Sequence, residues 1–326
     1  FERTWCEVKK IFKFVLFQLQ KILLIISYTF FSFFIKRVPD LWIVGVEEVA
    51  AYVQNIGKML EPSFTVSFSK NKFYNFQYSF SLPSRILLTK LFLNLYSPIL
   101  LGYLMNKSDR FFYVWHTGFL IDGCDGRKFE FSFLKKKKKT VCCLFVGNDI
   151  RSPKLALESA RNMDLEITAS YYDLVAPYRL KESYEKHKKL IASSADEFAD
   201  IVFNAPIDQI SYLKKPTYPC FYVYPDEAFV RRDAKFLDLS IIKILHAPSS
   251  PIVKGSQIVR AAIKKLRVEG YQFIYTELIG IPNERVLELL RESHIVLNEF
   301  YAFVPGFFGI EAMASHCALV TSGDPH

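Results

Sequence analysis

From residue 41 onward, short apolar runs alternate with longer amphipathic stretches, and this order restricts the chain to few folds. The predicted strands are residues 41–44, 64–68, 111–115, 140–146, 201–203, 241–245, 271–277 and 295–297. The predicted helices are 47–59, 85–104 with a break at Pro98, 183–199, 256–268 and 284–293. Parallel strands need crossover helices, so this order predicts an α/β fold of parallel sheets covered on both faces.

The length of 326 residues gives room for two domains. We expect a hydrophobic N-terminal helix over 1–38, a Rossmann-like domain over 39–235 and a second one over 236–326. A Pro-rich, aromatic stretch near 216–233 marks the crossing between them. The chain starts without Met and stops at His326 directly after an apolar run, so we expect a fragment whose second domain is incomplete.

Composition narrows the class of protein. A content of 51% hydrophobic and 23% charged residues excludes wholesale disorder, and the net charge of +9 favours anionic partners. The six cysteines form no CxxC pair and have no histidine at zinc spacing, which indicates reduced thiols in a cytoplasmic protein. The sequence contains no dinucleotide or P-loop fingerprint and no Asp-x-Asp pattern, so we predict no metal site.

The N-terminal region carries an uncharged apolar run over residues 22–35. A spanning helix needs about 20 apolar residues, so this run is short, and Lys13, Gln18 and Lys21 do not gather on one helical face. Two interpretations stay open: a helix packed on the domain, or a monotopic anchor at an anionic inner membrane leaflet. The five lysines at 135–139 favour a solvated turn before a strand over a binding site.

Two segments near the C-terminus have the chemistry of an anion and sugar site. The loop 246–255 joins a strand to a helix, and Lys254 stands at the helix start, where a cation is unfavourable unless an anion compensates it. The segment 305–314 is a glycine turn that leads into a helix bearing Glu311, whose carboxylate is able to accept hydrogen bonds from sugar hydroxyls. Open α/β sheets bind ligands at the edge where such loops emerge.

These segments resemble retaining, nucleotide-sugar-dependent glycosyltransferases of the GT-B architecture. Residues 246–255 look like their donor-phosphate loop, and 306–314, with Glu-Ala-Met-Ala, looks like their nucleotide-sugar helix. The resemblance implies two Rossmann-like domains facing across a cleft. It assigns the donor diphosphate to Lys254 and the ribose to Glu311. The donor-binding set is Ser250, Lys254, Gly255, Gly306, Phe307, Gly309 and Glu311.

The N-terminal half supplies candidates for the acceptor side. His116 ends one predicted strand, and Asp149 follows another, so either side chain is a candidate to orient or deprotonate an acceptor hydroxyl. A histidine hydrogen-bonded at a strand end, and an aspartate that pairs with Arg151 or caps a helix, are equally open interpretations. Gly45 and Arg151 are the remaining acceptor-side candidates.

We therefore expect a metal-independent transferase that moves sugar from a nucleotide-sugar donor, without a cofactor, to a polysaccharide or lipid-linked acceptor. Several positions depart from the family pattern: Phe303 replaces a glutamate, Pro248 or Ser249 an arginine, Val146 a histidine and His316 a glycine. These departures motivate an alternative, a non-catalytic nucleotide-sugar-binding or membrane-docking subunit. A nucleic-acid binder rests only on charge and the lysine run, so no nucleic acid is expected.

Overall fold

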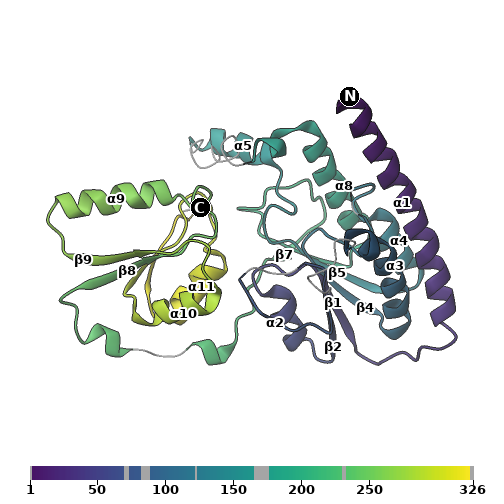
Figure 1. Cartoon of the computed structure of the whole chain (residues 1–326), viewed down its shortest axis with the longest axis horizontal. Coiled ribbons are helices and arrows are strands. Elements are labelled where there is room, and N and C mark those ends of the chain that lie inside the picture. Colours follow the sequence, from purple (N-terminus) through teal and green to yellow (C-terminus); the bar gives the residue numbers. More distant parts are fainter. Residues whose placement is uncertain are drawn as a thin grey trace. The chain divides into compact units, whose positions relative to one another are not determined.

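A computed structural model describes residues 2–69, 73–81, 89–121, 123–164, 176–229 and 233–323. These residues form two compact units. Unit 1 contains 2–69, 76–81, 89–121, 123–152 and 182–221, and unit 2 contains 73–75, 153–164, 176–181, 222–229 and 233–323. Each unit has its own parallel sheet (Figure 1). The predicted α/β class with parallel sheets is confirmed.

Unit 1 contains a seven-stranded sheet in the order β3-β2-β1-β4-β5-β6-β7, and every neighbouring pair is parallel. Its strands are β1 (Trp42–Val46), β2 (Ser63–Ser67), β3 (Phe80–Ser81), β4 (Arg110–Val114), β5 (Thr140–Leu144), β6 (Ile201–Asn204) and β7 (Tyr218–Pro219). The chain winds outward in both directions from β1 and β4, so the topological switch point lies between these two strands.

Helices α1 (Glu2–Phe31), α2 (Tyr52–Met59), α3 (Thr89–Lys107), α4 (Lys128–Lys136) and α8 (Glu182–Phe198) belong to unit 1. Helix α1 packs along α3, and α4 packs against α8. Four consecutive side chains of β4, from Phe111 to Val114, are buried, as expected for a strand covered on both faces.

The predicted break at Pro98 is wrong, because α3 continues through it. Proline lacks an N–H group and leaves the carbonyl four residues earlier without its helical partner. That carbonyl belongs to Asn94, and the Gln20 side-chain amide of α1 donates to it at 2.8 Å. A contact from a distant helix therefore compensates the interruption. The predicted start of this helix, residues 85–88, lies outside the described residues.

Other element boundaries moved by a few residues. Helix α2 begins at Tyr52 rather than 47, and β1 continues through Gly45 to Val46. The lysine run is not wholly a turn: Lys135 and Lys136 form the last turn of α4, and 137–139 lead into β5. Cations are favourable at the C-terminal end of a helix.

Unit 2 contains a four-stranded parallel sheet in the order β11-β10-β8-β9. Its strands are β8 (Ile242–His246), β9 (Phe273–Glu277), β10 (Ile295–Leu297) and β11 (Ala318–Val320). Its α-helices are α5 (Pro153–Asn162), α9 (Ser256–Val268), α10 (Asn283–Glu292) and α11 (Gly306–Ala314), and its 3₁₀ turns are Pro177–Leu180, Asp226–Ala228 and Asp233–Phe236.

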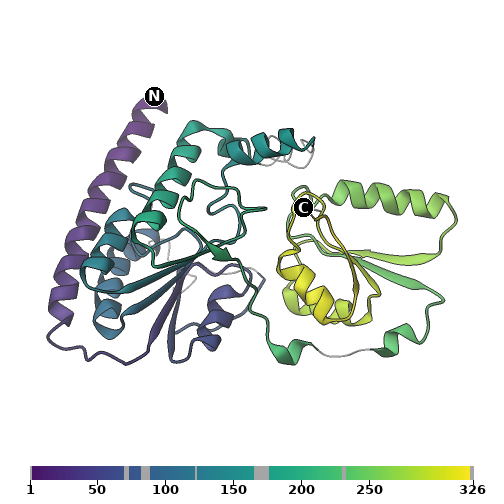
Figure 2. The ribbon, with the colours of Figure 1, turned by 180° about the vertical axis from the view of Figure 1, so that it is seen from behind.

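Helix α9 covers one face of this sheet, and α10 with α11 covers the other (Figure 2). Alternation along β8 explains the two layers: Ile244 packs with Val259 and Ile263, whereas Leu245 packs with a second cluster that includes Leu290 and Ala312. The switch point of unit 2 lies between β8 and β10, so the loops that follow these two strands emerge side by side.

Candidate functional site

Lys254, Glu299 and Gly306 meet at the switch point of unit 2. Lys254 ends the loop after β8, and its ammonium forms an ion pair with the carboxylate of Glu299, which follows β10. Gly306 has φ of 61°, and a Cβ built there would lie 3.5 Å from Glu299 Oε1 and 3.9 Å from Lys254 Nζ. The cation, the carboxylate and the glycine turn thus share one small volume at the start of α11.

The backbone at the start of α9 brings Lys254 to this place. The Lys254 N–H donates to the Ser250 carbonyl at 3.0 Å, and Gly255 caps the helix with φ of 71°. A side chain at Gly255 would be strained by this left-handed conformation and would approach Phe300 Cβ to 3.1 Å. Ser250 and Gly255 therefore form the turn that carries the lysine.

His246, the last residue of β8, is hydrogen-bonded to both β10 and α9. Its ring is fully buried, with Nδ1 2.7 Å from the Leu297 carbonyl and Nε2 2.7 Å from Ser256 Oγ. A carbonyl only accepts, so Nδ1 carries the proton and the Ser256 hydroxyl donates to Nε2. Burial lowers the pKa of His246, in agreement with a neutral ring. The pair holds the ends of β8 and β10 against α9.

Asn298 is hydrogen-bonded to the residue that precedes α11. Its side-chain Nδ2 donates to the Pro305 carbonyl at 2.6 Å, and its backbone N–H donates to the Val320 carbonyl of β11 at 2.9 Å. The side chain is buried, and within the described structure its Oδ1 atom has no hydrogen-bond partner. Gly309 accommodates this arrangement, because a Cβ there would lie 3.1 Å from Asn298 Nδ2 and 2.7 Å from Pro305 Cβ.

Glu311 lies inside unit 2, on α11. Only 3% of the residue is exposed, and the Asn283 side-chain Nδ2 donates to it at 2.8 Å. Burial raises the pKa of Glu311 to about 7, and the bond from Asn283 opposes the rise. The carboxyl group therefore changes its charge near neutral pH. Phe307, one turn earlier, is also buried, and its ring packs edge-on against Tyr224 at 5.4 Å.

Two of the departures from the family pattern have a structural counterpart. Phe303 stands where a glutamate was expected, yet Glu299 brings a carboxylate to Lys254 from four residues earlier. The sequence signal for Glu299 was its place two residues after the apolar run of β10. His316, which replaces a glycine, adopts φ of 57° just past the end of α11, the left-handed conformation that glycine favours there.

In unit 1, His116 follows β4, which borders the switch point, and Asp149 follows the neighbouring strand β5. The His116 ring lies edge-on to the ring of His187 from α8, with 5.7 Å between centroids. Asp149 is fully buried and accepts hydrogen bonds from the N–H groups of Val146 and Gly147, at 3.1 and 2.8 Å. Burial raises the pKa of Asp149, and the charge of His116 is the largest effect that opposes the rise.

Arg151 and Gly45 have structural contacts in unit 1. The Arg151 guanidinium forms an ion pair with Asp208, and its Nε donates to the Asp208 carbonyl at 2.7 Å. Gly45 lies inside β1, where an added Cβ would be 2.7 Å from the Val66 carbonyl oxygen of β2. Arg151 thus joins the segment after β5 to the segment after β6, and Gly45 allows β1 and β2 to lie close together.

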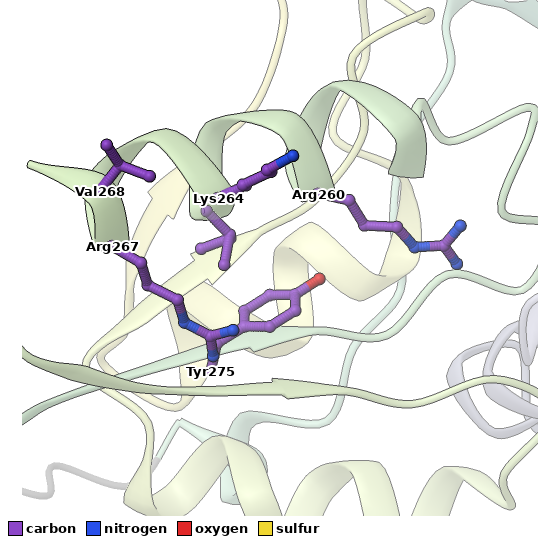
Figure 3. Close-up of a pocket in the computed structure, with 6 residues that line it drawn as sticks. Arg260, Lys264, Arg267, Val268 and Tyr275 are labelled. Carbon is purple, nitrogen blue, oxygen red and sulfur yellow. The ribbon is translucent and has the colours of Figure 1, made fainter.

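A separate basic pocket lies between α9 and β9 (Figure 3). None of the predicted site residues lines it. Arg260 forms an ion pair with Glu277, and the Arg267 guanidinium lies 5.7 Å from the Phe273 ring centroid, so these cations already have partners. Among the described residues, no three His, Cys, Asp or Glu side chains are close enough to hold a metal ion.

Comparison of the chain with models of protein families, with curated proteins and with solved structures finds no match.

Proposed function

We propose that unit 2 binds the diphosphate of a nucleotide sugar, and that the protein transfers the sugar to a glycan or lipid-linked acceptor. The observation that carries the proposal is the convergence of Lys254, Glu299 and Gly306 at the start of α11. A helix N-terminus presents N–H groups and partial positive charge, and the lysine adds a full charge beside it. The proposal includes the GT-B architecture, because the chain has two α/β units with separate parallel sheets.

In this proposal the diphosphate replaces Glu299 as the partner of Lys254. The Lys254 side chain is 24% exposed, whereas that of Glu299 is 5% exposed. Gly306 would let the phosphates approach the backbone. Glu311, which the resemblance assigns to the ribose, is 3% exposed and already accepts from Asn283, so the donor proposal rests on Lys254 and Gly306. His246 and Asn298 would act as positioning residues, because they hold the two loops in place.

The reaction forms a bond between the acceptor oxygen and the anomeric carbon of the sugar. The bond from that carbon to the phosphate oxygen breaks, and the nucleoside diphosphate leaves with the electron pair. The acceptor proton passes to a base, for which His116 and Asp149 are the candidates in unit 1. Lys254 and the amides of α11 would stabilise the negative charge that grows on the leaving phosphate, which is the kind of effect that usually contributes most to catalysis.

Calorimetry with UDP, GDP, ADP and CDP tests the donor site. We expect one of these diphosphates to bind and Lys254→Ala to abolish the binding. Lys265→Ala is the matched control, because this lysine lies on α9, the helix that follows Lys254, with a side chain 79% exposed. Unchanged binding by the Lys254 variant, or no binding by the natural chain, would overturn the assignment.

A second candidate is a non-catalytic nucleotide-sugar-binding subunit. It is favoured by the enclosure of Asp149, whose carboxylate already accepts two backbone N–H groups. This function predicts binding of the nucleotide sugar without hydrolysis or transfer to glycan and lipid-linked acceptors. Release of nucleoside diphosphate that depends on an acceptor would decide for the enzyme.

A further inference from the structure

Helix α1 carries large apolar residues on its outward side as well as on its buried side, unlike an ordinary surface helix. The side that faces the rest of unit 1 includes Leu16, Phe17 and Leu24, together with Gln20 and Ser27, and all five residues are buried. The outward side carries the exposed Lys13 and a row of large apolar residues that are 41–64% exposed: Val8, Ile11, Phe12, Phe14, Val15, Leu19, Ile22, Ile25, Ile26 and Phe30. Figure 1 shows the helix along the margin of unit 1.

The inward contacts hold α1 in this orientation. Gln20 donates to the Asn94 carbonyl at 2.8 Å and accepts from the Ile121 N–H at 2.9 Å. Ser27 packs so closely on α3 that a Cβ at Gly102 would lie 2.2 Å from its hydroxyl oxygen. Rotation of the helix would break these bonds and expose Leu16, Phe17 and Leu24, which are now buried. The apolar row therefore stays outside the core of unit 1.

The two hydroxyl groups on the outward side donate to backbone carbonyls of the same helix. Thr29 Oγ1 donates to the Ile25 carbonyl at 2.9 Å, and Ser32 Oγ donates to the Thr29 carbonyl at 2.7 Å. Lys21 folds back over the Phe17 and Phe129 rings. In a medium without water, polar groups must be satisfied within the protein, and this side of the helix meets that condition at both hydroxyls.

The lysine run lies beside the C-terminal part of α1. Lys137 Nζ is 4.7 Å from the centroid of the Tyr28 ring, and Tyr28 contacts Phe133 of α4 edge-on at 5.7 Å. Lys135 and Lys139 form ion pairs with Asp200 and Asp109. The three lysines between them, Lys136, Lys137 and Lys138, are exposed, and the described residues hold no carboxylate paired with them.

We propose that the outward side of α1 and Lys136–Lys138 together dock unit 1 on an anionic lipid bilayer. The apolar row would enter the boundary between headgroups and acyl chains, and the lysines would meet the negative headgroups beside it. Residues Ile11–Phe31 are long and apolar enough to cross a membrane. Since the inward side is bonded to α3, we infer that the helix lies in the plane of the membrane. This docking surface belongs to unit 1, whereas the proposed nucleotide site belongs to unit 2.

Cosedimentation with phosphatidylcholine vesicles, with and without phosphatidylserine, tests the proposal. We expect binding to the serine-containing vesicles. The variant Ile11→Gln, Val15→Gln, Ile22→Gln, Ile26→Gln should weaken it by at least about tenfold. The matched control makes the same change at four exposed apolar residues of unit 2: Ile258, Val268, Ile274 and Ile279. Unchanged circular dichroism would show that both variants fold.

A second variant tests how much the positive charge of the three lysines contributes to vesicle binding. Changing Lys136, Lys137 and Lys138 to Gln should reduce binding to anionic vesicles by at least about tenfold and leave the weaker binding to neutral vesicles unchanged. Changing Lys264, Lys265 and Arg267 of α9 to Gln is the control and should have no effect on either kind of vesicle.

Three results would overturn the proposal. One is the absence of vesicle binding together with a dimer that the apolar variant abolishes, which would make a second copy of the chain the partner. Another is equal binding to neutral and anionic vesicles. The third is resistance to extraction at alkaline pH, which would show a helix that spans the bilayer. Nucleoside diphosphate binding should survive in the vesicle-binding variants, so the two proposals fail separately.

Discussion

Lys254 and Glu299, 45 residues apart in the chain, form an ion pair where the loops after β8 and β10 leave the sheet of unit 2. The two strands are neighbours in the sheet although β9 lies between them in sequence. An anion that binds at the start of α11 therefore has to compete with a carboxylate that is already in place.

Replacing Glu299 with Gln removes this competing charge. Gln keeps the size of the side chain, so Lys254 becomes available to the ligand without a cavity. We expect nucleoside diphosphates to bind more tightly, by up to about tenfold, because a negative charge close to the phosphates has been removed. Calorimetry at two salt concentrations measures the effect. Weaker binding would mean that Glu299 contacts the ligand directly.

Glu311 makes the stability of unit 2 depend on pH. Its folded pKa of about 7 lies above the unfolded value of 4.5, so the folded state binds more protons between these values. The contribution is fully present below pH 4.5 and is lost as the pH rises to 7, which amounts to about 3 kcal/mol. Glu311→Gln should remove this dependence and stabilise unit 2 at pH 8.

Hydrogen exchange of α10 and α11 peptides at pH 5.5 and 8, corrected for the intrinsic exchange rate, measures this effect. Glu48 of unit 1 is the control, since burial also raises its pKa to about 7. Glu48→Gln should alter exchange in α2 and leave α11 unchanged. Slower exchange of α11 at pH 8 than at pH 5.5 in the natural chain would contradict the assignment.

Lys235 joins the C-terminal ends of two helices. Its Nζ donates to the Ser293 carbonyl at 2.6 Å, at the end of α10, and to the Ser315 carbonyl at 2.8 Å, at the end of α11. Lys235→Met keeps the aliphatic stem and removes both charged bonds, so unit 2 should lose about 2–3 kcal/mol. Urea unfolding followed by hydrogen exchange of α10 measures the loss. Lys243→Met, which removes a pair with the exposed Glu292, should have little effect.

His316→Gly should stabilise unit 2 by about 1 kcal/mol, because φ of 57° is strained for histidine and allowed for glycine. Thermal unfolding provides the measurement. Gly280→Ala is the reverse control and should destabilise unit 2. Gly280 has φ of 69°, which is strained for alanine, and open space around it, so the added methyl group meets no other atom. Loss of stability in the His316 variant would show that its contact with Asp233, at 3.6 Å, outweighs the strain.

Much of the fold could be predicted because strand and helix patterns are local. Helix α9 and strand β10 have the predicted boundaries. The continuation of α3 through Pro98 could not be predicted from sequence, because the compensating hydrogen bond comes from Gln20, far away in the chain.

The sequence by itself determined the α/β class, the parallel sheets, the loop that bears Lys254 and the glycine turn and helix that bear Gly306 and Glu311. These features follow from the periodicity and the turn residues of each segment. Only the tertiary structure decided that Glu299 is the partner of Lys254, that Glu311 is buried beside Asn283, and that the lysine run lies next to α1. Strand order and helix packing bring distant residues together, and no local pattern encodes which side chains then meet.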